Sequence, residues 1–152
     1  MTDAQPTTNS GGATITRTFS APRELVYDAW VTPEHFAAWF GGSSVEVPID
    51  SVSMDVRAGG DWKATMIIGN GVPDIHWFGE FVELDRPNRV VLTLTDRPGI
   101  AREIVSVTFT AVSDGTEMLF HQTGGNLSAE EYERTAAGWQ TFFDALEALV
   151  TK

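Results

Sequence analysis

Histidine is the first residue type to examine for chemistry, because imidazole binds metal ions and exchanges protons near neutral pH. The three histidines, His35, His76 and His121, lie in separate segments, and no pair has the HExxH spacing of zinc enzymes. The chain contains no cysteine, which excludes a thiolate metal site, a cysteine nucleophile and a disulfide. We therefore expect no metal site and no cofactor, and we place each histidine at the surface or in a hydrogen bond.

The other patterns that could support catalysis are incomplete. Gly69 and Gly71 supply two of the three glycines of a dinucleotide-binding GxGxxG motif, and a hairpin turn explains both. No GxSxG nucleophile motif occurs. Glu80, Glu83 and Asp85 could pair their carboxylates at a cleft, but a strand edge with a solvated acidic turn is the simpler interpretation. We name no catalytic residue and favour a protein that is not an enzyme.

Aromatic residues are the strongest remaining signal, with five Trp and nine Phe in 152 residues. Strand alternation and helical spacing place many of them on inward faces, where they either fill a solid core or line an apolar pocket. Such pockets hold roughly 300–1,000 Å³ and need a few polar anchors; Gln122, Gln140, Tyr132 and the indole N–H groups are the candidates here. The residues predicted to line a cavity are Trp39, Trp62, Met66, Phe81, Val107, Phe109, Met118, Phe120, Gln122, Tyr132, Trp139 and Phe143.

Periodicity and turn residues predict the elements that must position these side chains. The β-branched segment 13–20 alternates like a strand. Pro22 and Pro33 each begin a helix, and the second of these ends at Gly41 and Gly42. Turn residues separate six further segments, and such short turns imply antiparallel pairing. We place these strands near 44–56, 60–69, 75–84, 89–96, 102–112 and 116–124.

The C-terminal segment has the clearest pattern. Ser128 and Glu131 form a capping box. A helix from Ser128 to Val150 would be about 34 Å long at ~1.5 Å per residue, which spans a small domain. The sequence therefore predicts an α+β fold of order β-α-α-β6-α, in which a curved antiparallel sheet of about seven strands wraps around one long C-terminal helix. The apolar residues at helical spacing are Tyr132, Ala136, Trp139, Phe143, Leu146 and Val150.

Composition narrows the class of partner. The formal charge of −11, from 10 basic and 21 acidic residues, repels nucleic-acid phosphates and anionic lipids, so we expect neither nucleic acid nor membrane as a partner. No stretch approaches the roughly 20 apolar residues that cross a bilayer, and the N-terminus lacks a signal-peptide pattern, so we expect a cytoplasmic protein. We predict a disordered tail over residues 1–12 and one domain over residues 13–152.

Five segments resemble the AHSA-type family, named for an activator of a heat-shock chaperone's ATPase, within the SRPBCC, START and Bet v-like helix-grip superfamily. The resemblance covers about residues 13–151 in order and is specific for fold rather than function. It implies a cavity between sheet and long helix that could hold a lipid, a polyketide or another apolar molecule. The segments are FSAPRELVYDAWVTPEHFAAWFGG (19–42), GGDWKATM (59–66), GEFVELDRPNRVVLT (79–93), VTFTAVSDGTEMLF (107–120) and GWQTFFDALEALV (138–150).

Three functions follow as hypotheses. The first is binding of a small apolar molecule in that cavity. The second is a polyketide cyclase- or aromatase-like or hydrolase-like enzyme, which requires polar groups that converge inside the cavity. The third is a chaperone-regulating or stress-response interaction module, which the family name suggests. The sequence also allows a second copy of the chain as a partner, in a homodimer.

Overall fold

A curved sheet dominates the computed structural model, which describes residues 7–9, 11–97, 99 and 101–151. Among these residues eight strands pair antiparallel in the order β1-β2-β8-β7-β6-β5-β4-β3. The seven predicted strands are all present, and β1 is an addition at one edge. The strands are β1 (Thr7–Asn9), β2 (Gly12–Phe19), β3 (Ser53–Met54), β4 (Asp61–Met66), β5 (Ile75–Asp85), β6 (Arg89–Leu94), β7 (Glu103–Val112) and β8 (Gly115–Thr123).

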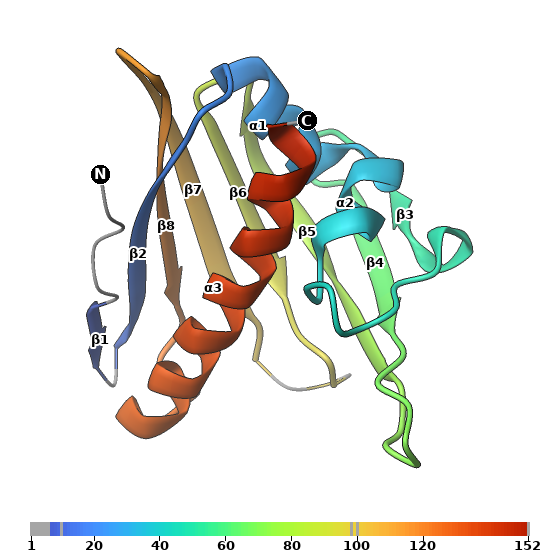
Figure 1. The fold of residues 1–152 in the computed structure, drawn as a ribbon. Helices are drawn as coiled ribbons and strands as arrows, with labels where there is room; N and C mark the ends of the chain where they lie inside the picture. Colours follow the sequence, from blue (N-terminus) through green and yellow to red (C-terminus); the bar gives the residue numbers. More distant parts are fainter. Residues whose placement is uncertain (1–6, 10, 98, 100, 152) are drawn as a thin grey trace.

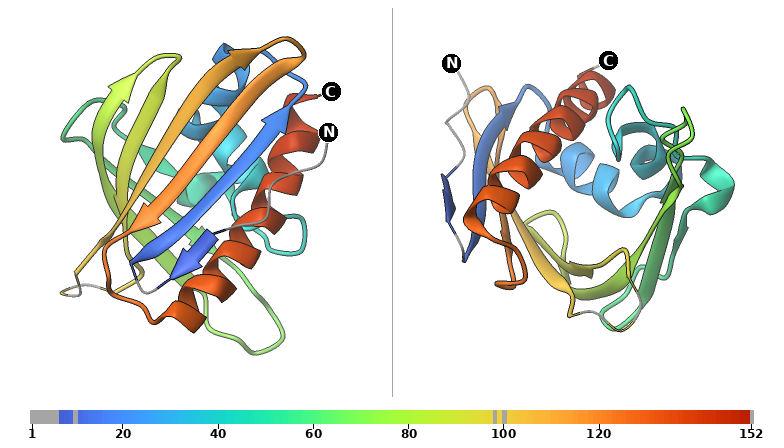
Figure 2. Two further views of the ribbon diagram at one scale, coloured as in Figure 1. Left: turned by 90° about the vertical axis from the view of Figure 1, so that its left-hand side faces the viewer. Right: turned by 90° about the horizontal axis from the view of Figure 1, so that it is seen from below.

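The helices occupy the concave side of this sheet. α3 (Ala129–Val150) runs diagonally across it, while α1 (Arg23–Val31) and α2 (Pro33–Trp39) lie beside the C-terminal half of α3 (Figures 1 and 2). A register shift in β5 between Phe81 and Glu83 marks a bulge, a feature that bends strands. The predicted α+β arrangement of a sheet around a long C-terminal helix is confirmed.

The α3 helix begins and packs as its sequence predicts. The Glu131 backbone N–H donates to Ser128 Oγ at 3.1 Å, and the Ser128 N–H donates to Glu131 Oε1 at 2.9 Å, which confirms the capping box. All six apolar residues of the predicted stripe, from Tyr132 to Val150, are buried. None of the helices in the described part of the chain is long and apolar enough to cross a membrane.

Two boundaries differ from the sequence prediction. The segment 44–56 is mostly a loop, with a 3-10 turn (η1, Ile49–Ser51) before the two residues of β3. Pro48 has no N–H to donate to a sheet, and its carbonyl instead accepts hydrogen bonds from the Ser51 N–H and hydroxyl. At the N-terminus, residues 7–9 of the expected tail 1–12 pair with β2 as β1. Gly12, the last residue of that expected tail, is the first residue of β2, and residues 1–6 and 10 lie outside the described residues.

Candidate ligand pocket

A pocket of about 450 Å³ lies beside the N-terminal half of α3, between this helix and the ends of β6 and β7. Residues 95–97 and Ala101, between β6 and β7, line one side of the pocket, and Phe40, directly after α2, lines another. Its apolar lining consists of Phe40, Trp77, Leu94, Ala101, Leu127, Trp139 and Phe142, with Gly138 between them on the helix. Its polar lining consists of Thr95, Asp96, Arg97, Glu103, Gln122, Asn126, Glu131 and Thr135.

The aromatic part of the lining is a connected cluster of rings. The ring centroids of Phe40 and Phe142 are 5.6 Å apart, and Trp139 lies 5.3 Å from Phe142 and 6.1 Å from Phe40. Trp77 extends the cluster at 6.4 Å from Phe40. These separations are those of edge-to-face and tilted aromatic pairs, which stabilise one another beyond simple burial. The pocket therefore has an apolar side made of mutually contacting aromatic rings.

A buried carboxylate is the centre of the polar part of the lining. Glu103 is the first residue of β7 and is only 8% exposed. The Tyr132 hydroxyl donates to its Oε1 at 2.8 Å, and Gln122 Nε2 donates to the same atom at 3.1 Å. Asn126 Nδ2 donates to its Oε2 at 2.6 Å. Hydrogen bonds from three side chains thus hold this carboxylate in place within the fold.

The network continues from Glu103 into the helix and the preceding loop. Gln122 Oε1 accepts a hydrogen bond of 2.8 Å from the Trp139 indole N–H, and the Gly125 N–H donates to the Tyr132 hydroxyl at 2.9 Å. Burial, followed by the hydrogen bond to Glu103, raises the pKa of Tyr132 above its ordinary value. The network therefore joins β7, β8 and α3 and fixes the side chains at one end of the pocket.

Gly124 is needed for the close approach of the loop to this carboxylate. Its φ of 149° lies in a region that favours glycine, and a Cβ at this position would collide with Glu103 Oε2. The loop before α3 can therefore lie directly against Glu103 only with glycine at this position.

The residues predicted to line a cavity divide into two groups. Gln122 and Trp139 line the pocket, and Tyr132 hydrogen-bonds to Glu103 at its edge. The other nine are buried in the core and are not among the residues that line this pocket: Trp39, Trp62, Met66, Phe81, Val107, Phe109, Met118, Phe120 and Phe143. Gln140, the remaining polar candidate, accepts a hydrogen bond from Arg17 through its Oε1 at 3.2 Å. Both the solid core and the pocket are therefore present, in different parts of the same sheet–helix space.

Glu103 is the residue that the sequence interpretation missed. A signal was available, because Glu103 continues the alternation of Val105, Val107 and Phe109, all of which face inward. An acidic residue at a strand start is normally exposed, so its inward register was not used.

The other candidates for chemistry do not converge. His121 Nδ1 lies 2.8 Å from Thr14 Oγ1 and His76 Nδ1 lies 3.0 Å from Thr65 Oγ1, both at exposed sites. Glu83 pairs with Arg89 at 3.3 Å on the exposed surface. No group of three or more His, Asp or Glu side chains suited to a metal ion occurs within the described part of the chain.

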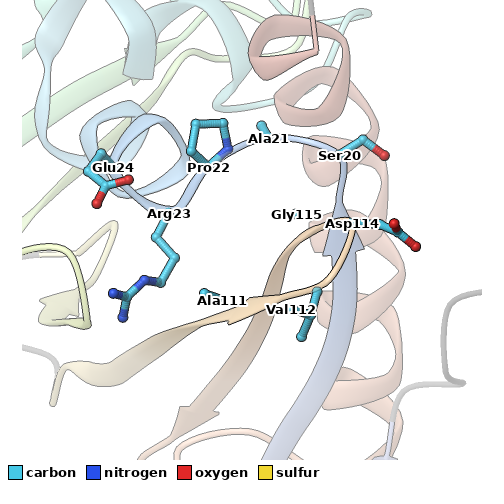
Figure 3. Close-up of a pocket in the computed structure, with 9 residues that line it drawn as sticks. All are labelled: Ser20, Ala21, Pro22, Arg23, Glu24, Ala111, Val112, Asp114 and Gly115. Carbon is cyan, nitrogen blue, oxygen red and sulfur yellow. The ribbon is translucent and has the colours of Figure 1, made fainter.

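A second depression of about 490 Å³ opens at the surface where β2 leads into α1, above the β7–β8 hairpin (Figure 3). Arg23 and Asp114 are among its lining residues, and Figure 3 shows their side chains pointing in different directions. Arg23 Nη1 is already hydrogen-bonded to Asn88 Oδ1 at 2.7 Å. This depression is shallow and open to solvent, and no set of polar groups converges in it.

The architecture of a curved sheet that holds a long helix, with a pocket between them, defines the helix-grip class of proteins. The model of one family, the activator of Hsp90 ATPase homolog 1-like proteins, matches residues 20–151. The chain belongs to this family, which is of the AHSA type within the SRPBCC superfamily. A search of curated proteins finds no match.

Solved structures show the same fold. Protein CV1439 from Chromobacterium violaceum is 26% identical, with a TM-score of 0.84 over 93% of this chain and 99% of that one. Protein Ms6760 from Mycobacterium smegmatis is 19% identical, with a TM-score of 0.80 over 98% and 97% of the two chains. The AHSA1-like protein from Aeromonas hydrophila is 21% identical, with a TM-score of 0.75 over 91% and 90%. The last two likenesses concern the fold alone.

Proposed function

We propose that the chain binds a small, mainly apolar molecule in the pocket beside α3. The volume of about 450 Å³ lies within the ~300–1,000 Å³ typical of ligand sites. The lining follows the usual composition of such sites, an aromatic surface with a few fixed polar groups at one end. Lipid-like and polyketide-like molecules both have an apolar body that suits the aromatic side.

The observation that supports this proposal most directly is the open space at Gly138. This glycine lies on α3 between Ala137 and Trp139, and a Cβ added there would meet no atom within 4 Å. Glycine inside a helix is unfavourable by about 0.5–1 kcal/mol relative to alanine. A glycine kept at this cost next to a pocket leaves room for a guest against the helix backbone.

Binding is favoured over catalysis because of how Glu103 is held. Both of its carboxylate oxygens accept hydrogen bonds from the protein, through Tyr132 and Gln122 at Oε1 and Asn126 at Oε2. A general base needs an oxygen that can reach the proton of a substrate. This arrangement instead suits a fixed charge that orients a bound molecule.

The experiment is to titrate the protein with the neutral dye N-phenyl-1-naphthylamine, whose fluorescence rises in apolar surroundings, and to repeat this with Gly138→Leu. The leucine side chain occupies the pocket, so we expect at least about a tenfold loss of dye affinity with the fold retained. Ala137→Leu is the matched control, because Ala137 is the exposed neighbour on the same helix turn and does not line the pocket.

Two results would contradict the proposal. One is wild-type protein that neither binds the dye nor retains any molecule from a cell lipid extract in native mass spectrometry. The other is equal dye binding by wild type, Gly138→Leu and Ala137→Leu, which would place the dye elsewhere on the molecule.

A further inference from the structure

The charges around the pocket point to a class of ligand. Three carboxylates, those of Asp96, Glu103 and Glu131, line the pocket together with one guanidinium, that of Arg97. Arg97 can offset only one of the three: its Nε lies 3.8 Å from Asp96 Oδ1, and its side chain is 76% exposed. The lining therefore carries an excess of negative charge, within a chain whose formal charge is already −11.

Among these charges, Glu103 gives the strongest indication of the ligand's charge, because it is buried. It is 8% exposed, and among the residues that the structure describes its oxygens accept hydrogen bonds only from neutral donors. No ion pair joins it to a lysine or arginine in the described part of the chain. A buried charge without a counter-charge is costly to the fold, and a cation that enters the pocket would reduce this cost.

The aromatic side of the pocket favours the same sign of charge. Trp139, Phe142, Phe40 and Trp77 form one connected cluster along the lining. The faces of such rings carry partial negative charge and attract ammonium groups, most strongly where water is excluded. Rings and carboxylates together are the composition that recognises an amine, and they repel a carboxylate or phosphate.

From these observations we propose that the ligand is a cationic amphiphile, an apolar body with one protonated or quaternary amine that is placed between the aromatic cluster and Glu103. This proposal rests on the proposed function, since it names the chemical class of the molecule in the same pocket. It also gives Glu103 a role in selectivity in addition to holding the loop before α3 against β7.

The test uses three probes that share one bicyclic body and differ in charge: 1-naphthylmethylamine, 1-naphthylmethanol and 1-naphthoate. Affinities are measured by calorimetry and by displacement of N-phenyl-1-naphthylamine at neutral pH and low salt. We expect the amine to bind about tenfold more tightly than the alcohol, and the carboxylate to bind most weakly. An amine that binds no better than the alcohol, or a carboxylate that binds best, overturns the proposal.

The variant Glu103→Gln keeps the size of the side chain and removes its charge. We expect the preference for amine over alcohol to fall to about twofold or less. Asp96→Asn is the matched control at the exposed rim, with an expected loss of about twofold that disappears at high salt. A preference that survives Glu103→Gln unchanged overturns the role assigned to Glu103.

The two proposals fail in different ways. If the neutral dye and the alcohol bind but the amine has no advantage, the pocket is a ligand site and the cationic class is wrong. If the dye and all three probes fail to bind the wild type, the proposed function fails, and the inference about charge fails with it. If Glu103→Gln does not fold by circular dichroism, the order of the three probes on wild type alone decides the proposal.

Discussion

The two halves of the space between sheet and α3 differ in how completely side chains fill it. In the half covered by α1 and α2, Trp30 lies 4.8 Å from Trp39 and 6.2 Å from Phe143 between ring centroids, and all three are almost fully buried. In the other half, Gly138 faces open space and a pocket of about 450 Å³ remains. The same sheet and helix therefore have a solid core at one end and a pocket at the other.

Trp139 lies between the two halves and shows what separates them. Its ring lies 6.0 Å from Trp30 and 4.8 Å from Phe120 on the core side, and it lines the pocket on the other. The two halves also differ in how their polar groups are hydrogen-bonded. In the core half the Trp30 indole N–H has no hydrogen-bond partner among the described residues, whereas the pocket half contains the network around Glu103. The aromatic rings of α1 and α2 fill one end of the space between the sheet and α3, and polar side chains line the other end.

The largest expected effect comes from truncating a ring in the core half. Phe143→Ala removes a fully buried side chain that contacts rings on several elements, so we expect a loss of about 3–5 kcal/mol in unfolding free energy. Trp139→Ala should cost less, about 2–3 kcal/mol, because part of the indole already faces empty space. Urea denaturation measures both losses.

Dye binding then distinguishes the two truncations. N-phenyl-1-naphthylamine affinity should fall in Trp139→Ala and stay near the wild-type value in Phe143→Ala. The opposite pattern, or an equal loss of affinity in both variants, would remove the distinction between core and pocket.

Tyr132→Phe is the next largest change and acts on the pocket half. It removes the hydroxyl that donates to the buried Glu103 carboxylate and accepts from the N–H of the exposed Gly125, so both groups lose a partner. We expect a loss of about 1–3 kcal/mol in unfolding free energy. Tyr27→Phe is the control, since Tyr27 is equally buried on α1 and lies outside the Glu103 network. Equal losses in the two variants would show that the network adds nothing to ring packing.

Much of this architecture could be predicted from local sequence patterns. The capping box at Ser128, the apolar stripe of α3 and the turn glycines each act over a few residues, and each is confirmed. The prediction of a strand over 44–56 was wrong in extent, because Pro48 and the 3-10 turn after it interrupt the alternation of inward and outward side chains.

The division into core and pocket could not be predicted in the same way. Inward-facing rings give the same alternation whether another ring fills the space opposite them or not. Trp39, Phe120 and Phe143 looked equivalent to Trp139 in sequence, and only the placement of α1 and α2 separates them. Glu103 was missed for a related reason, because three of its partners come from β8, the loop before α3 and α3 itself.

A smaller effect tests whether the space at Gly138 is open. Gly138→Ala adds a methyl group where no atom lies within 4 Å and also improves helix propensity. We expect a gain of about 0.5–1 kcal/mol in unfolding free energy with dye affinity nearly unchanged. Thermal and urea denaturation measure the gain. A destabilised variant would mean that the helix backbone is packed at this point, as it is in the core half.

The titration of the two tyrosines has the smallest effect on stability at neutral pH. It also reports on each half of the molecule separately, because each tyrosine titrates in its own surroundings. Burial raises the pKa of Tyr27, with a further rise from Asp28, and burial raises the pKa of Tyr132, with a further rise from its hydrogen bond to Glu103. A pKa raised above the unfolded value of about 10 means that the folded chain keeps protons that the unfolded chain releases. The resulting stability is complete below about pH 10 and is lost as the pH rises through the folded-state values.

The tyrosinate absorbance of Tyr27→Phe and Tyr132→Phe assigns each titration, because the chain has only these two tyrosines. In Glu103→Gln, the pKa of Tyr132 should move toward its ordinary value, since the hydrogen bond to a carboxylate is gone, while Tyr27 should titrate as in wild type. A shift of both tyrosines would mean that Glu103 acts on the whole space under α3. A shift confined to Tyr132 would show that its influence ends where the aromatic core begins.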